Sequence, residues 1–163
     1  MNKEKKVKVL FVCMGNICRS PTADAIFRHQ VKMAGLVSDI KVDSAGTHSY
    51  HIGHSPDERA QAAALKRGYD MEDLRARSVA PEDFSQFDYI LAMDHDNLAI
   101  LEDRCPQQHQ HKLALLMRYS KNHTADDEVS DPYYGGKQGF EKVLDKVEAA
   151  SEGLLEHICQ SDL

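Results

Sequence analysis

The sequence of 163 residues predicts a single α/β domain over residues 1–163, with a four-stranded parallel sheet, helices on both faces and a flavodoxin-like, doubly wound arrangement. Three observations favour this fold. Short apolar patterns typical of strands alternate with helical patterns, which indicates a parallel sheet with right-handed crossovers. The length matches about one domain of average size. No repeat, low-complexity tract or linker rich in Pro, Gly or Ser divides the chain.

The first strand is predicted over residues 7–12, a short apolar run rich in β-branched side chains. A helix should follow, with Ser20 as its N-cap, Pro21 at its first position and Gly35 at its C-terminal end. Its buried stripe would consist of apolar residues at helical spacing: Ala23, Ile26, Phe27 and Val31.

The second strand is predicted from residue 40, where apolar and charged residues alternate through residue 43, and it ends in Ser44-Ala45-Gly46. Residues 55–57 should open a second helix that ends before Gly68, and a short helical turn should follow Pro81. The inward residues of this second helix would be Ala60, Ala63 and Ala64.

The second half of the chain continues the alternation. A third strand is predicted at residues 88–93, a helix capped by Asp94 at 94–103, and a fourth strand at 113–117. Residues 118–136 are predicted to form a long loop, and such loops in compact domains are often functional. The last helix is indicated by apolar residues that keep a helical period: Phe140, Val143, Leu144, Val147, Leu154, Leu155 and Ile158.

Composition excludes several classes of protein. Apolar residues make up 42% and charged residues 28%, which is ordinary for a globular domain. With 20 basic and 26 acidic residues the net charge is −6, so neither nucleic acid nor an anionic membrane is the expected partner. Because the apolar run at 9–14 is too short for a membrane span or a secretory signal, we expect a cytoplasmic protein with reduced cysteines.

The segment from Cys13 to Ser20 carries the most distinctive chemistry. It has the spacing C-x5-R-S and lies between the first predicted strand and helix. A loop at a helix N-terminus directs backbone N–H groups inward, where they and the helix dipole bind a dianion. Gly15 permits backbone conformations that other residues resist, and Arg19 can bind two phosphate oxygens. The segment therefore predicts a phosphate-binding loop.

The same positive field should favour the thiolate form of Cys13, which makes it a nucleophile near neutral pH. Its sulfur could attack phosphorus and form a phosphocysteine, while the hydroxyl of Ser20 hydrogen-bonds the sulfur. A general acid must then protonate the leaving oxygen. Asp131, in the segment Asp131-Pro132-Tyr133-Tyr134, is the candidate. Each signal alone is weak, since a buried cysteine often serves packing and Asp-Pro often marks a turn.

Taken together, these motifs resemble those of the low-molecular-weight protein tyrosine phosphatase family over nearly the whole chain. The resemblance rests on VLFVCMGNICRSP, DSAGT, DYILAMD and DPYYGG. It implies a cysteine nucleophile, an anion-binding arginine and a general acid, here Cys13, Arg19 and Asp131. Between the nucleophile and the helix it implies a phosphate-binding loop whose members are Met14, Gly15, Asn16, Ile17, Cys18 and Ser20.

The resemblance also implies supporting residues. Asn16 would hold the loop in shape together with Ser44, and Tyr50 would lie at the cavity rim. Tyr133 and Tyr134 resemble the family's paired tyrosines, which line the cavity and can themselves be phosphorylated. Cys18 would trap an oxidised Cys13 as a reversible disulfide. The alternative for Cys18 is a small apolar residue that faces the core. The histidines around the rim, in THSYHIGH, are less typical of the family and affect the expected substrate preference.

The resemblance implies a metal-independent enzyme with no cofactor, acting on a phosphotyrosine protein or a small aryl phosphate as a monomer or weak dimer. We expect His48, His51 and His54 to be solvated loop residues rather than metal ligands, since no Cys-x2-Cys accompanies them. Two alternatives remain: an arsenate reductase on the same fold, which needs a disulfide relay, and a non-catalytic module that binds a phosphorylated ligand. Cys105 and Cys159 have no partner spacing and are expected to be structural or surface thiols.

Overall fold

The computed structural model describes residues 7–121, 127–132 and 136–163 and contains a four-stranded sheet in the order β2-β1-β3-β4. All neighbouring strands are parallel, as the alternating pattern predicted. The strands are β1 (Val7–Cys13), β2 (Ile40–Gly46), β3 (Tyr89–Ala92) and β4 (Leu113–Leu115). The carboxyl ends of β1 and β2 are paired, because Cys13 is in register with Gly46.

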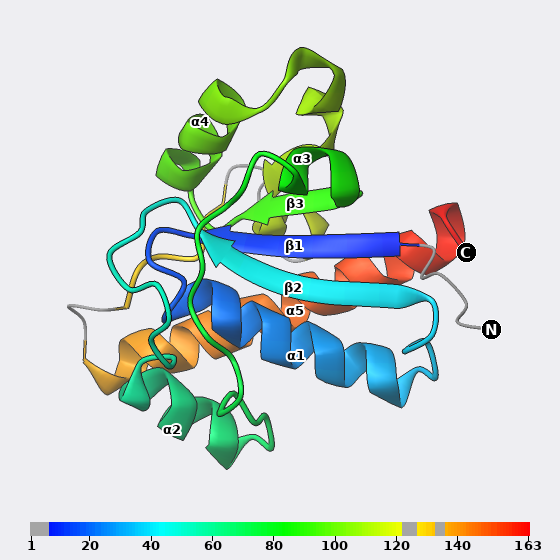
Figure 1. Ribbon diagram of the computed structural model, residues 1–163. Helices are drawn as coiled ribbons and strands as arrows, with labels where there is room; N and C mark the ends of the chain where they lie inside the picture. Colours follow the sequence, from blue (N-terminus) through cyan, green and yellow to red (C-terminus); the bar gives the residue numbers. More distant parts are fainter. Residues whose placement is uncertain (1–6, 122–126, 133–135) are drawn as a thin grey trace.

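Helices cover both faces of the sheet (Figure 1). One face carries α1 (Arg19–Met33), α2 (Glu58–Lys66) and the long α5 (Lys137–Ser161), and the other carries α3 (Asp83–Gln86) and α4 (His95–Arg104). The central strand β1 supplies both cores. Val9 and Phe11 pack into the cluster under α1 and α5, whereas Leu10 and Val12 pack into the cluster under α3 and α4. Because both faces of β1 are buried, its sequence is a nearly continuous run of apolar residues instead of an alternation of apolar and polar ones.

The predicted helix ends are largely confirmed. Asp57 caps α2 by accepting from the backbone N–H groups of the first turn, and Asp94 caps α4 in the same way. Gly35 and Gly68 follow α1 and α2 with φ of 73° and 89°, the left-handed backbone that glycine adopts most readily. These ends depend on local backbone chemistry, which short sequence signals describe well.

Two predicted features are wrong. Ser20 is not the N-cap of α1, which begins at Arg19 after Cys18 without a side-chain cap, because the Ser20 hydroxyl is turned toward Cys13. The fourth strand ends at Leu115, and a 3-10 helix, η2 (Leu116–Tyr119), replaces the rest of the predicted strand. Leu116 is fully buried there, so the apolar run reflected burial rather than extended backbone.

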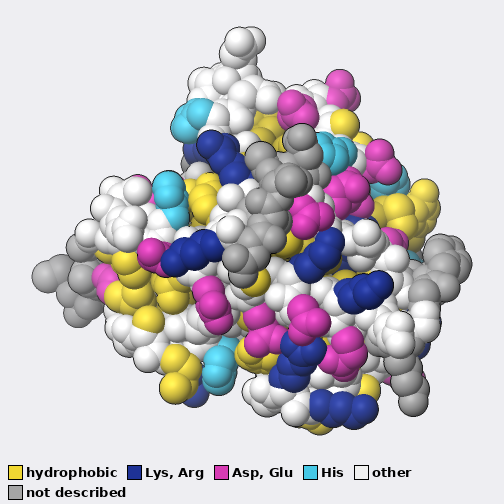
Figure 2. Space-filling model, turned by 180° about the vertical axis from the view of Figure 1, so that it is seen from behind, with side chains coloured by type: hydrophobic (Ala, Val, Ile, Leu, Met, Phe, Trp, Pro, Cys, Tyr) yellow, Lys and Arg dark blue, Asp and Glu magenta, His cyan; other side chains and the backbone are white. Residues whose placement is uncertain are grey.

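A second 3-10 helix, η1 (Gln107–Lys112), was not predicted, because its polar sequence carries no apolar period. Acidic and basic side chains are interspersed on the face shown in Figure 2, as expected for a domain without a basic stripe. Within the described ranges, no helix combines the length and the hydropathy that crossing a membrane requires.

Candidate active site

The loop that connects β1 to α1 lies at the carboxyl edge of the sheet, where parallel α/β folds bind ligands. Its carbonyl groups point outward. Thr47 and His48 donate their backbone N–H groups to the carbonyls of Cys13 (2.9 Å) and Met14 (3.0 Å), and Asp57 donates to Ile17 (2.8 Å). Among the described residues, no backbone carbonyl accepts from the N–H groups of residues 14–18. Those N–H groups are therefore available to an anion.

Cys13 lies at the floor of a cavity of about 330 Å³ with its side chain almost fully buried. Its Sγ is 3.0 Å from the hydroxyl oxygen of Ser20, which confirms the predicted contact. The residues that line the cavity are Cys13, Met14, Gly15, Ile17, Cys18, Arg19, Tyr50, His51 and Asp131.

Asn16 holds the loop in shape with three hydrogen bonds. Its buried side-chain amide donates to the hydroxyls of Ser20 (2.8 Å) and Ser44 (3.1 Å), and its carbonyl oxygen accepts from the backbone N–H of Arg77 (3.0 Å). The expected pairing of Asn16 with Ser44 is therefore present. The side chain of Asn16 links the loop to β2 and to the segment that follows α2.

Gly15 was expected to supply a backbone conformation that other residues resist, and this expectation is wrong. The residue with a positive φ is Asn16, at 57°, and asparagine tolerates this backbone better than most residues. Gly15 matters instead for space, because a Cβ there would lie 2.9 Å from the ring of His51. The absent side chain lets His51 lie against the loop and form one wall of the cavity.

Gly46, the last residue of β2, was missed as a site residue. A Cβ at this position would lie 2.8 Å from the carbonyl oxygen of Met14 and 3.1 Å from the carbonyl carbon of Gly15. The phosphate-binding loop therefore passes directly over bare backbone. The motif DSAGT contained the signal, but only the pairing of β2 with β1 shows that its glycine supports the loop.

Arg19 is buried and held by two groups. Its Nη1 donates to Asp94 Oδ2 at 2.5 Å and to the carbonyl of Val129 at 3.0 Å. Burial by itself would lower the pKa of Arg19, but the charges of Cys13, Asp94 and Asp131 raise it above its ordinary value. The guanidinium therefore stays charged and oriented inside the site.

Asp94 was expected only to cap a helix, and it does so through Oδ1, which accepts from the N–H of Asn97 at 2.8 Å. Its second oxygen binds Arg19, so one carboxylate serves both α4 and the site. Its position directly after β3, next to the end of β1, was the signal that could have assigned this role.

Asp131 lies at the cavity with Oδ2 3.8 Å from Nη2 of Arg19, and its side chain is exposed enough to meet solvent or substrate. Tyr50 also lines the cavity; it is 70% exposed and stacks on His48, with ring centroids 5.3 Å apart and planes 12° apart. Tyr133 and Tyr134 lie outside the described residues.

Cys18 fits both interpretations made from the sequence. It is 5% exposed and packs in the core cluster, yet it also lines the cavity that contains Cys13. Burial, followed by the charges of Asp57 and Cys13, raises the pKa of Cys18 to about 12. All four cysteines are free thiols. Within the part of the chain that the structure describes, no three His, Cys, Asp or Glu side chains are grouped to hold a metal ion.

Comparisons with known proteins agree with this geometry. A family profile described as low molecular weight phosphotyrosine protein phosphatase matches residues 8–162. A Streptomyces coelicolor protein named low molecular weight protein-tyrosine-phosphatase is 44% identical over 150 residues, covering 91% of each chain. A Homo sapiens protein named low molecular weight phosphotyrosine protein phosphatase is 38% identical over 156 residues, covering 96% of this chain and 98% of the human one. The crystal structure of a protein tyrosine phosphatase from Entamoeba histolytica superposes with a TM-score of 0.91 at 42% identity and covers 96% and 99% of the two chains.

Proposed function

Because the chain belongs to the low molecular weight phosphotyrosine protein phosphatase family, we propose that Cys13, Arg19 and Asp131 together hydrolyse phosphotyrosine monoesters in two steps. The observation that carries this assignment is the position of the Cys13 sulfur. It lies 3.0 Å from the Ser20 hydroxyl, inside a loop whose N–H groups are available to an anion and beside a buried, anchored arginine.

In the first step the thiolate of Cys13 attacks phosphorus, and the bond to the ester oxygen breaks. The loop N–H groups and the guanidinium of Arg19 bind the three equatorial oxygens, which carry charge in the transition state. Asp131 donates its proton to the departing phenolate oxygen, so tyrosine leaves neutral. The carboxyl lies at the mouth of the cavity, where a leaving group would emerge.

In the second step a water molecule attacks the phosphorus of the phosphocysteine. Asp131, now a carboxylate, accepts a proton from that water, and the S–P bond breaks to release phosphate. Ser20 donates a hydrogen bond to the departing sulfur and stabilises it as a thiolate. The same carboxyl group thus serves as acid and then as base.

The walls of the cavity support this substrate class. Tyr50 and His51 flank the entrance and offer aromatic surface to an aryl ring, which favours phosphotyrosine proteins and small aryl phosphates. Support for a cytoplasmic setting comes from the four free thiols, which a reducing compartment maintains. The enzyme would act as a monomer or weak dimer on a protein substrate, with neither nucleic acid nor membrane as a partner.

The alternatives are not favoured. An arsenate reductase needs a disulfide relay with further thiols. Cys18 lines the cavity of Cys13, but Cys105 lies at the end of α4 and Cys159 lies on α5, and neither of these two lines that cavity. The named relatives are phosphatases. A non-catalytic binding module would need the loop and Arg19, but it would need neither the thiol of Cys13 nor the carboxyl group of Asp131 in the same cavity.

The nucleophile can be tested by Cys13→Ser. We expect turnover of p-nitrophenyl phosphate to be lost, because a serine hydroxyl is far less ionised than a thiol at neutral pH. Vanadate or phosphate should still bind, since the N–H groups and Arg19 are retained. The measurement combines steady-state turnover with a titration of vanadate binding.

Cys159→Ser is the matched control, because it removes an exposed thiol on α5 and should keep full turnover. Turnover at the wild-type rate in Cys13→Ser would remove this mechanism. Arsenate consumption with a thiol donor, in place of phosphatase turnover, would instead support the reductase.

A further inference from the structure

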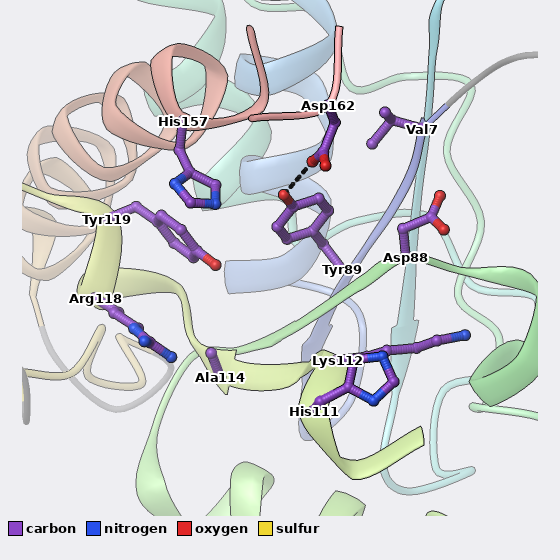
Figure 3. Close-up of a pocket in the computed structure, with 10 residues that line it drawn as sticks. All are labelled: Val7, Asp88, Tyr89, His111, Lys112, Ala114, Arg118, Tyr119, His157 and Asp162. Carbon is purple, nitrogen blue, oxygen red and sulfur yellow. Dashed lines mark hydrogen bonds between the residues drawn. The ribbon is translucent and has the colours of Figure 1, made fainter. Parts of the chain in front are cut away.

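A second and larger cavity, of about 690 Å³, lies at the opposite edge of the sheet, where β1, β3 and β4 begin. We call it the basal cavity. It shares no residue with the active-site cavity. At ~3.3 Å per residue along β1, it lies about 20 Å from Cys13. The residues that line it are Val7, Asp88, Tyr89, His111, Lys112, Ala114, Arg118, Tyr119, His157 and Asp162 (Figure 3).

One wall of the basal cavity is aromatic. The rings of Tyr89, Tyr119 and His157 meet one another, with centroids 6.3, 6.0 and 5.3 Å apart. They come from β3, η2 and α5, so three separate elements hold the cluster in place. Such rings offer a flat ligand both edges and faces with little loss of side-chain entropy.

Three of the charged side chains that line the basal cavity, Lys112, Asp88 and Asp162, already make hydrogen bonds within the protein. Lys112 donates to the carbonyls of Phe84 (2.8 Å) and Ser85 (3.3 Å). Asp88 accepts from the backbone N–H of Lys8 at 2.8 Å, and Asp162 accepts a short hydrogen bond from the Tyr89 hydroxyl. Arg118 is thus the charged residue of the lining that makes no such bond within the described part of the chain.

Four other side chains that line the basal cavity can donate hydrogen bonds that no described residue accepts. Arg118, His111, His157 and the hydroxyl of Tyr119 have no hydrogen-bond or ion-pair partner among the residues the structure describes, although Arg118 carries a full positive charge. Burial raises the pKa of Tyr119, so its hydroxyl remains a donor at neutral pH. Arg118 and His111 lie on opposite sides of Ala114, whose small side chain leaves room between them (Figure 3). A ligand that brings acceptors would satisfy this arrangement.

We propose that the basal cavity is a binding site for a small aromatic anion, a flat ring that carries a carboxylate or phosphate group. The ring lies against Tyr89 and Tyr119, and the anionic group binds the guanidinium of Arg118 with His111 as a second donor. The volume falls in the range of sites for small molecules. The site is separate from the catalytic one, so its ligand and a ligand of the phosphate-binding loop bind at the same time.

The proposal can be tested with 4-hydroxybenzoate as the probe and NMR of the histidine rings as the readout. The enzyme is first saturated with vanadate, so that the phosphate-binding loop is occupied. We expect saturable shifts of the ring signals of His111 and His157. In Arg118→Gln the affinity should fall about tenfold, since a charged hydrogen bond is lost. Arg118 is exposed, so this variant keeps the fold and its turnover of p-nitrophenyl phosphate.

Arg75→Gln is the matched control, because it removes the same charge from an exposed loop position outside the basal cavity and should bind the probe as the wild type does. Phenol tests the need for the anion and acetate the need for the ring, and both should bind at least about tenfold more weakly. Absence of saturable shifts would overturn the proposal. So would equal weakening in both arginine variants, or binding of phenol or acetate as tight as that of the probe.

Discussion

At the scale of single residues, the site depends on side chains that each hold more than one group. Asn16 bonds two hydroxyls and one backbone N–H while its own backbone adopts a positive φ. Asp94 caps α4 and anchors Arg19 with its two oxygens. Such shared contacts keep the loop N–H groups oriented before an anion arrives, which is the preorganisation that electrostatic catalysis requires.

Asp131→Asn tests the general acid. Asparagine cannot donate a carboxylic proton, so phosphoenzyme formation should slow most for esters with poor leaving groups. We expect a fall in turnover of about 10²–10⁴-fold for phenyl phosphate and a smaller fall for p-nitrophenyl phosphate, measured as kcat and as a burst of phenol release.

Asp103→Asn is the control for this variant, since it removes an equal charge from an exposed position near the end of α4. It should behave as the wild type with both esters. An equal loss for good and poor leaving groups in Asp131→Asn would assign Asp131 to substrate binding instead of proton transfer.

Cys18 is proposed to protect an oxidised Cys13. Peroxide oxidises the Cys13 thiolate to a sulfenic acid and is itself reduced to hydroxide. Attack by the Cys18 thiolate on that sulfur would form the S–S bond and break the S–O bond, and the hydroxide released takes up a proton to become water. Because burial raises the pKa of Cys18 to about 12, the reactive thiolate is scarce at pH 7 and increases roughly tenfold per pH unit below that pKa. We therefore expect disulfide formation, followed by mass spectrometry, to accelerate between pH 7 and pH 9.

The same experiment separates the two interpretations of Cys18. Dithiothreitol should restore turnover to the oxidised wild type and to Cys105→Ser, a buried thiol outside the active-site cavity, but only poorly to Cys18→Ser. Equal recovery in all three proteins would leave Cys18 as a core residue alone.

At the scale of elements, the site is a strand, a loop and a helix supported by the neighbouring strand. Gly46 of β2 is the contact point, and it is held on both sides, because its N–H donates to the carbonyl of Arg77 and its carbonyl accepts from the N–H of Val79. Gly46 is therefore fixed in place, and it presents bare backbone to the loop.

Gly46→Ala tests this support. The new Cβ would meet the carbonyl of Met14 at 2.8 Å, and because that neighbour is backbone the loop must shift. We expect a loss of about 1–3 kcal/mol in the free energy of unfolding and a fall in kcat/KM, measured by urea denaturation and steady-state kinetics. Gly136→Ala, where no atom lies within 4 Å of a new Cβ, should lose less stability and keep its turnover. Unchanged kinetics in Gly46→Ala would show that the loop tolerates the displacement.

At the scale of the whole molecule, an ionic network joins α2 to α5, two helices that cover the same face of the sheet. Arg67, directly after α2, binds three carboxylates of α5: Glu141 at 2.5 Å, Asp145 at 3.0 Å and Glu148. The hydroxyl of Tyr69 also donates to Glu148. Because the arginine is 27% exposed and the carboxylates are more so, solvent screens these pairs and limits what they contribute.

Arg67→Met should therefore lower the free energy of unfolding by only about 1 kcal/mol at low salt, and the loss should shrink as sodium chloride screens the wild-type network. Urea denaturation at two salt concentrations measures both effects, while kcat should stay unchanged because α2 and α5 contact the site only indirectly. Lys121→Met removes a single exposed pair with Glu156 and should have no measurable effect. A loss in Arg67→Met that does not depend on salt would point to packing by the arginine stem.

The sequence by itself determined the sheet, the helices and the phosphate-binding loop of this protein. The apolar periods predicted four strands and the long helix α5, and C-x5-R-S placed Cys13, Ser20 and Arg19 in one turn of chain. These features depend on residues close in sequence, for which spacing and backbone chemistry are sufficient.

Only the tertiary structure decided which distant residues complete the site. Asp94, Gly46 and the carbonyl of Val129 reach the loop because β1 lies between β2 and β3, and no local pattern states that strand order. Ser20 illustrates the same limit: its sequence position suits a cap, but its hydroxyl lies 3.0 Å from the sulfur of Cys13, and α1 has no side-chain cap. Local signals predict what a residue can do, and packing selects which partner it meets.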